Sequence, residues 1–262
     1  MQHDPRGDTY RMAPAPYRTE PLEVRDGIPR FSAENEYTRN YEAIARDHLE
    51  SFHRDGSNPF IPEEMWVAAE NSTAELVRRH VAGGRRILDV GVGMGRLLSR
   101  FPDLERYGMD ISFGYLRHAQ RCGIEVCYAM IEDMPYREEY FDAVVCTDVL
   151  EHVLDLNLCV RNILRPLKRN GLLFVRTPYR EGLEGYTSPD LPYEYVHLRN
   201  FDEHSLTLLF TRIFRNRVLE HRFVHYEGPK QGGAGVRLRR ILRKARGKRP
   251  PPVEINVVVQ KL

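Results

Sequence analysis

The sequence predicts an α/β fold, in which a seven-stranded, mostly parallel sheet carries helices on both faces and follows a helical cap. Residues 87–90 form a short apolar run, and glycines at 91, 93 and 95 follow it before a helical pattern resumes. A strand, a glycine loop and a helix open a nucleotide-binding βαβ unit. Asp110 ends the next apolar segment, 19 residues after Gly91. Strand-like and helix-like segments then alternate along the chain, which favours a parallel sheet.

The glycine loop excludes two of the ligand classes that share this geometry. No lysine follows the glycines, so the loop is not a P-loop. A dinucleotide fold prefers its third glycine one position later, where this chain has Arg96. Asp89 lies just inside the end of the strand, and its carboxylate would repel a pyrophosphate but stabilise a cationic amino or sulfonium group. A purely structural glycine turn is the alternative.

The stretch from Asp89 through Gly91, Gly93 and Gly95 resembles the first motif of the class I S-adenosylmethionine (SAM)-dependent methyltransferases, which have a Rossmann-like fold. The segment Asp110-Ile111-Ser112 resembles the second motif, whose acid holds the ribose hydroxyls, and its distance from the glycine loop is close to the roughly 20 residues expected. The resemblance covers residues 84–178 and implies SAM as cofactor, with S-adenosylhomocysteine as product.

Residues 130–136 and 141–145 resemble the family's G-D-A-x-x-L-P-F and F-D-x-V segments. In the family the acid of the first segment meets the adenine amino group. This chain has Met130 at that position, so we expect the adenine to pack on Met130 and Ile131, with Glu132 nearby.

Acidic and histidine side chains follow the predicted strand at 143–146. Carboxyl ends of parallel strands are where such sheets bind ligands, so Thr147 and Asp148 are predicted to contact the cofactor. His152 follows in a segment similar to that of small-molecule O- and C-methyltransferases, and His197 lies in a segment similar to the acceptor wall of glycan and quinone methyltransferases. Both histidines are predicted bases, since the imidazole pKa lies near working pH. For each, a purely structural role is the alternative.

Asp148, Glu151 and His152 also resemble the E-x-x-E-H segment of some metal-assisted O-methyltransferases, with Asp148 replacing the first acid. Because of that departure, the prediction is that the chain has no metal site.

The remaining elements follow from periodicity and from turn residues. Residues 1–30 hold five scattered prolines and are predicted to be an extended or disordered leader. Residues 31–83 are predicted to form the helical cap, and residues 84–262 the SAM-binding domain, whose last strand inserts antiparallel. The predicted cap helices are 31–52 and 62–81, the later helices include 157–167 and one from Asp202 to residue 213, and the strands are 87–90, 106–109, 125–128, 143–146, 172–176, 218–226 and 255–260.

Charge is concentrated in one predicted insertion, 228–252. The net charge is +2, but residues 237–249 contain eight basic residues and no acid, with Leu238, Ile241, Leu242 and Ala245 at helical spacing. An anionic small-molecule or glycan acceptor, a lipid-linked one, a membrane surface or RNA would suit this segment, and a solvated charged excursion is the alternative. RNA has less support because the segment offers no aromatic stacking platform.

The chain shows no signal peptide, no membrane span and no paired cysteine spacing, which predicts a cytoplasmic protein with reduced cysteines and at most a peripheral membrane contact. The predicted function is methyl transfer from SAM to a hydroxyl of a small molecule or glycan. An RNA methyltransferase and a non-catalytic SAM-binding scaffold remain alternatives.

Overall fold

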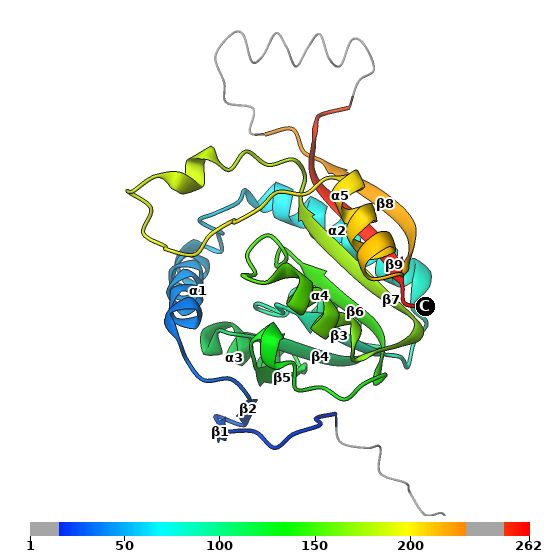
Figure 1. Ribbon diagram of the computed structural model, residues 1–262. Coiled ribbons are helices and arrows are strands. Elements are labelled where there is room, and N and C mark those ends of the chain that lie inside the picture. Colours follow the sequence, from blue (N-terminus) through cyan, green and yellow to red (C-terminus); the bar gives the residue numbers. More distant parts are fainter. Residues whose placement is uncertain (1–15, 229–248) are drawn as a thin grey trace, which may run out of the picture.

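In the computed structural model, residues 16–228 and 249–262 are described. The predicted basic insertion falls mostly on residues 229–248, and it therefore lies outside the described residues, as do residues 1–15. A single mixed sheet spans the described chain (Figure 1). Its strand order is β1-β2-β5-β4-β3-β6-β7-β9-β8. The bounds are β1 Glu23–Arg25, β2 Ile28–Arg30, β3 Arg86–Val90, β4 Glu105–Asp110, β5 Glu125–Tyr128, β6 Phe141–Thr147, β7 Leu167–Pro178, β8 Arg217–His225 and β9 Pro252–Gln260.

The centre of the sheet is parallel, as predicted. Strands β3, β4, β5, β6 and β7 all pair in parallel. The last strand, β9, lies between β7 and β8 and is antiparallel to both, so the predicted antiparallel insertion is confirmed. Because β8 then runs in the same direction as β7, the carboxyl end of β8 lies on the same side as those of the parallel strands.

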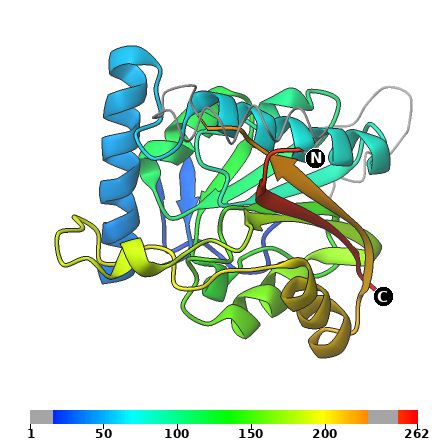
Figure 2. The same ribbon diagram turned by 90° about the horizontal axis from the view of Figure 1, so that it is seen from above.

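Helices cover both faces of the sheet (Figure 2). Alternate residues of each strand point to opposite faces, so Leu88 and Val90 join one buried cluster, with α4 and α5, while Ile87 joins the other, with α2 and α3. The helices are α1 Glu36–Asp55, α2 Glu63–His80, α3 Phe113–Arg121, α4 Leu156–Leu164 and α5 Glu203–Leu208, with short turns η1 Leu98–Arg100, η2 Ile131–Asp133, η3 Glu184–Thr187 and η4 Leu209–Ile213.

The part of the leader that is described is more ordered than its prolines suggest. Strands β1 and β2 form an antiparallel hairpin, and β2 adds to the edge of the sheet beside β5, with Arg30 opposite Tyr128. Ile28 is fully buried. Residues 23–25 and 28–30 of the predicted extended or disordered leader are extended, because pairing with the sheet orders a segment whose own sequence does not specify a strand.

The expected helix after the glycine loop is also absent from the described residues. The chain makes one 3₁₀ turn, η1, and passes directly to β4. Pro102 lies two residues after this turn, and proline disfavours helical conformation in the residue before it. Leu97 and Leu98 are buried, so the apolar residues that suggested a helix pack against the sheet from a turn.

Candidate functional site

The parallel strands end at a cavity of about 710 Å³. Its floor is formed by the carboxyl ends of β3, β4, β6 and β7, and its walls come from α1, α2 and the segment 179–200. In Figure 2, α1 and the segment 179–200 lie side by side beyond this edge of the sheet. The cavity therefore occupies the place where open α/β sheets bind ligands.

Most of the predicted cofactor residues line this cavity, although they come from four separate segments. Those that do are Asp89, Gly91, Gly93, Asp110, Ile111, Met130, Ile131, Glu132, Thr147 and Asp148. Gly95 does not line it: a Cβ placed on Gly95 would lie 2.7 Å from Ile124 and 3.0 Å from the Ala119 backbone. Gly95 therefore permits close packing of the loop against α3, and its predicted cofactor contact stays a prediction.

The glycine loop is held in shape by backbone and carboxylate hydrogen bonds. Gly91 has a φ of 80°, and a Cβ at this position would lie 2.4 Å from Val149. Asp110 accepts hydrogen bonds from the backbone N–H groups of Gly93, at 2.9 Å, and of Ile111, at 2.8 Å. Burial raises the pKa of Asp110 to about 6, against the lowering effect of these bonds. The same carboxylate thus organises the loop and faces the cavity.

Asp89 is buried to 2% exposure, and its Oδ1 atom has no hydrogen-bond partner. Burial raises the pKa of this carboxyl well above its usual range, and the nearby Arg176 acts in the opposite direction. An unpartnered buried carboxylate oxygen is costly, so Asp89 suits a cationic ligand group in the cavity.

Arg176, at the end of β7, was missed by the sequence analysis. It is 2% exposed and forms ion pairs with Asp148 and, at 2.7 Å, with Glu254 of β9. An arginine directly after the apolar segment 172–175 was the available signal. The carboxylate of Asp148, a predicted cofactor residue, is therefore engaged in the ion pair with Arg176.

Aromatic side chains from the cap, from α3 and from the segment 179–200 form the opposite wall of the cavity. They are Tyr37, Tyr41, Phe60, Trp66, Tyr115, Tyr186 and Tyr193. Hydrogen bonds join the two supporting segments: Asn40 of α1 bonds the backbone of Tyr195 and Glu194 at 2.8 Å each, and Tyr193 donates to Asp47 at 2.5 Å. The segment 179–200 is therefore tied to the cap.

The two predicted bases lie together in the cavity. The rings of His152 and His197 have their centroids 4.5 Å apart in an edge-to-face arrangement. Burial lowers the pKa of His152 to about 4, and His197 lowers it further, so His152 is neutral at neutral pH. His197 bonds Glu181 through Nδ1, and Tyr186 donates to the other oxygen of Glu181 at 2.8 Å.

Arg199 holds these two segments close to each other. It donates to the backbone carbonyls of Leu150, at 2.9 Å, and of Val153. The loop that carries His152 is therefore fixed beside the segment that carries His197, and sequence distance alone gave no indication of this contact.

Comparisons with known proteins identify the family. Residues 88–175 match the family described as methyltransferase domain. Residues 88–175 form a class I SAM-dependent methyltransferase domain. A ubiquinone biosynthesis O-methyltransferase of Xylella fastidiosa is 31% identical to this chain over 159 residues. The match covers 56% of this chain and 63% of the relative. The chain spans 54% and 63% of the length of two curated relatives that it matches, and less than half of others.

Solved structures agree on the fold of the methyltransferase domain. A SAM-dependent methyltransferase of Thermotoga maritima has a TM-score of 0.59 at 18% identity, over 86% of this chain and 99% of that chain. A cyclase has a TM-score of 0.60 at 18% identity, over 88% and 98%. Because a fold hosts more than one chemistry, these likenesses speak for the architecture alone.

The geometry of the methyltransferase domain fits SAM as its cofactor. Asp110, the predicted ribose-binding residue, lines the cavity, and the unpartnered Asp89 oxygen suits the cationic end of the ligand. Met130, at the predicted adenine position, lines the cavity with Ile131, and its backbone N–H donates to Ser32 at 2.8 Å. Within the described residues, no helix is both long and apolar enough to cross a membrane.

Proposed function

We propose that the chain transfers a methyl group from SAM to a hydroxyl group of a small-molecule or glycan acceptor. The observation that carries this proposal is a single cavity that joins the glycine loop at one end to His152 and His197 at the other. A cofactor held by the loop would therefore share its space with an acceptor held beside the histidines.

The cofactor end would work by binding and orientation. Asp110 would accept hydrogen bonds from the ribose hydroxyls, and Asp89 would stabilise the amino group. SAM supplies an electrophilic methyl group when bound. Aligning that methyl group with the acceptor in a closed cavity supplies about 7–11 kcal/mol of the barrier, so this chain's residues need mainly to position both molecules and to exclude water.

The acceptor end favours a partly apolar molecule with a hydroxyl group. Its wall is largely aromatic, so a ring or a sugar face can pack against Tyr41 or Tyr186. His152 and His197, beside this wall, would assist at the acceptor oxygen. Oxygen as the methyl acceptor has weaker support, from the name of the ubiquinone relative at 31% identity.

We further propose that the acceptor is anionic or lipid-linked, with the basic residues 237–249 as its contact or as a peripheral contact with the inner face of a membrane. This part of the proposal rests on the sequence alone, because most of that segment lies outside the described residues.

Calorimetric titration with SAM and with S-adenosylhomocysteine tests the cofactor, and transfer of label from methyl-labelled SAM tests the acceptor. The acceptor panel would contain phenols, glycans, phosphorylated small molecules and RNA. Micromolar SAM binding with labelling of a hydroxyl compound is the expected result. Salt-sensitive labelling of RNA would favour the RNA methyltransferase, and SAM binding together with liposome binding but without any transfer would favour the scaffold. No SAM binding would refute the proposal.

A further inference from the structure

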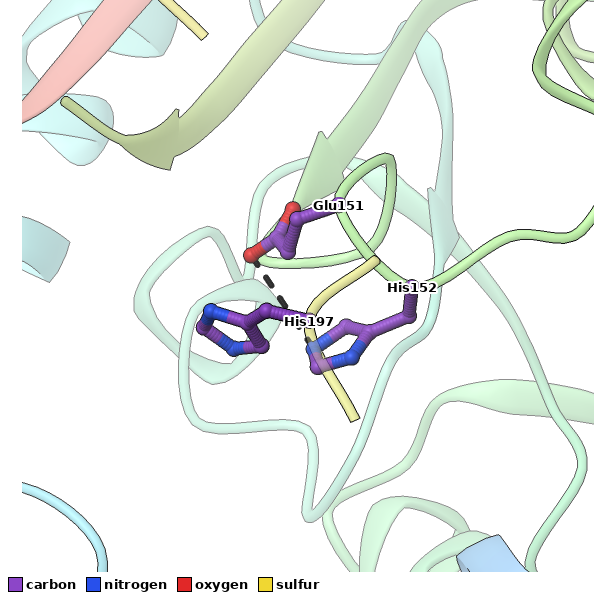
Figure 3. A group of neighbouring side chains, drawn as sticks. All are labelled: Glu151, His152 and His197. Carbon is purple, nitrogen blue, oxygen red and sulfur yellow. Dashed lines mark ion pairs between the residues drawn. The ribbon is translucent and has the colours of Figure 1, made fainter. Parts of the chain in front are cut away.

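Three potential metal ligands converge at the acceptor end of the cavity. Glu151 and His152 follow β6, and His197 lies in the segment 179–200 (Figure 3). One ligand atom from each lies within 4.8 Å of the other two. Among the described residues, no other group of three or more such side chains comes this close together.

The burial of Glu151 and of one nitrogen of His152 is not compensated by hydrogen bonds. Glu151 is 1% exposed, and neither of its carboxylate oxygens accepts a hydrogen bond. The Nδ1 atom of His152 is also buried without a partner, and the His152 ring approaches the Glu151 carboxylate no closer than 4.0 Å. Removing a carboxylate from water without pairing it is expensive, so a cation bound between these atoms would offset this cost.

His197 is arranged as a metal-binding histidine is usually arranged. Its Nδ1 atom bonds Glu181, which is itself held by Tyr186. Metal-ligating histidines almost always donate their other ring N–H to a carboxylate or carbonyl, which fixes the ring and its tautomer. The bond to Glu181 leaves Nε2 of His197 as the nitrogen for a ligand.

Asp148, which the sequence pattern would have placed among the ligands, is not available. Its carboxylate is engaged by Arg176. The ligand set is therefore one carboxylate and two imidazoles, which is the donor set of open, catalytic sites for zinc and similar transition metals. Magnesium prefers oxygen ligands and would be disfavoured by this set.

We propose that Glu151, His152 and His197 bind a divalent transition-metal cation such as Zn²⁺, with the remaining coordination positions open to the acceptor. This proposal departs from the sequence-based prediction of no metal site. This inference rests on the proposed function. The acceptor hydroxyl would bind the cation and release its proton to water. The acceptor oxygen then forms a bond to the methyl carbon as the carbon–sulfur bond breaks, and the sulfur keeps the electron pair. Acceptors with two adjacent oxygens would bind best, because they can occupy two positions.

The test uses the full-length, tag-free protein after removal of metals with a chelator. Co²⁺ binding is followed by its visible absorption and Zn²⁺ binding by calorimetry, with Mg²⁺ as the disfavoured ion. His53 and His118 lie at the surface with their Nε2 atoms 3.2 Å apart and would take up zinc adventitiously, so every measurement is made in a His118→Gln background. One equivalent of Co²⁺ with a tetrahedral or five-coordinate spectrum is the expected result.

Three variants assign the site. Glu151→Gln and His197→Gln should each abolish the Co²⁺ spectrum, and the second variant serves if the first does not fold. Glu181→Gln should weaken binding about 10- to 100-fold by releasing His197. His204→Gln, an exposed histidine beside a different carboxylate, is the matched control and should bind as the parent does.

Outcomes for the metal and for the function are separable because SAM binding is measured on the same samples. Methyl transfer by a protein that binds no cation would overturn the metal site and leave the proposed function standing. A bound cation without SAM binding would do the reverse. Unchanged cation binding in both Glu151→Gln and His197→Gln would show that the cation lies elsewhere, and the proposal would fall.

Discussion

The substitution Asp110→Asn separates the two roles of this carboxylate, loop organisation and ribose binding. Oδ1 accepts from the N–H groups of Ile111 and Ser112 at 2.8 and 3.0 Å, and Oδ2 accepts from that of Gly93 at 2.9 Å. Asparagine retains one oxygen for the first pair but presents an NH₂ group, a donor, where Oδ2 was. A hydrogen bond to a charged group contributes about 1.5–3 kcal/mol. Loss of the bonds between Oδ2 and the ribose should therefore weaken SAM binding about 10- to 140-fold.

Calorimetry with SAM measures this loss, and thermal unfolding of the ligand-free protein measures the effect on the loop. Asp142→Asn is the matched control. Asp142 also accepts a backbone hydrogen bond, from Arg86 at 3.0 Å, but it lies at the opposite end of the strands. It should lower stability without changing SAM affinity. If Asp110→Asn bound SAM within about threefold of the wild type, the assignment of Asp110 to the ribose would be wrong.

The pKa of Asp110 adds a second signature. Because burial raises it to about 6, the carboxylate takes up a proton as the pH falls through this value, and the wild-type SAM affinity should fall with it. The Asp110→Asn variant has no proton to take up at this position, so its affinity should lack this component. A wild-type affinity that stays constant from pH 7 to about pH 5 would contradict the assignment.

Three further predictions concern the rest of the cavity. Gly91→Ala should lower the free energy of unfolding measured by urea denaturation. The left-handed conformation should contribute about 1–2 kcal/mol and overpacking against Val149 about 1–3 kcal/mol. Gly93→Ala, where a Cβ meets nothing within 4 Å, should lack the packing component. Burial lowers the pKa of His48 to about 4, below its unfolded value of about 6.5, so stability should fall as the pH drops from about 6.5 to 4. His48→Gln should reduce this pH dependence of the melting temperature, and an identical dependence would refute the prediction. Asn40→Ala should accelerate hydrogen exchange in the backbone of residues 194–195, and unchanged exchange would mean that the bond to α1 does not secure this segment.

The parallel strands could be predicted from sequence because their signal is local. Strand β5 was predicted with the bounds observed, since residues 125–128 are a short run that closely follows the turn at Gly123. The start of a helix at Asp202 was also predicted, and the Asp202 side chain caps it by accepting from the Ser205 N–H at 2.8 Å. Both features depend on residues within a few positions of each other.

The hairpin of β1 and β2 could not be predicted in this way, because its stability comes from distant residues. Tyr17, before the hairpin, stacks on Tyr136 at 5.3 Å, and Phe31, after it, packs against Tyr17 at 4.7 Å. Neither contact can be seen in the sequence of the leader, whose prolines indicate the opposite. The same holds for Arg176, whose importance depends on Asp148 and Glu254, residues 28 positions before it and 78 positions after it.

The two ends of the cavity differ in the same respect, and this difference limits what sequence alone can say about the acceptor. The cofactor end is built from loops that each follow directly after a strand, so spacing alone located Asp110 and the glycines. The acceptor end is assembled from α1, the loop after β6 and the segment 179–200, which Asn40 and Arg199 hold together. Glu181 is 30 positions from Glu151 in the sequence, yet its bond to His197 fixes the orientation of His197 beside Glu151. Because these contacts are long-range, a change in Asn40 or Arg199, which lie outside the ligand set, should alter acceptor affinity while leaving SAM affinity unchanged.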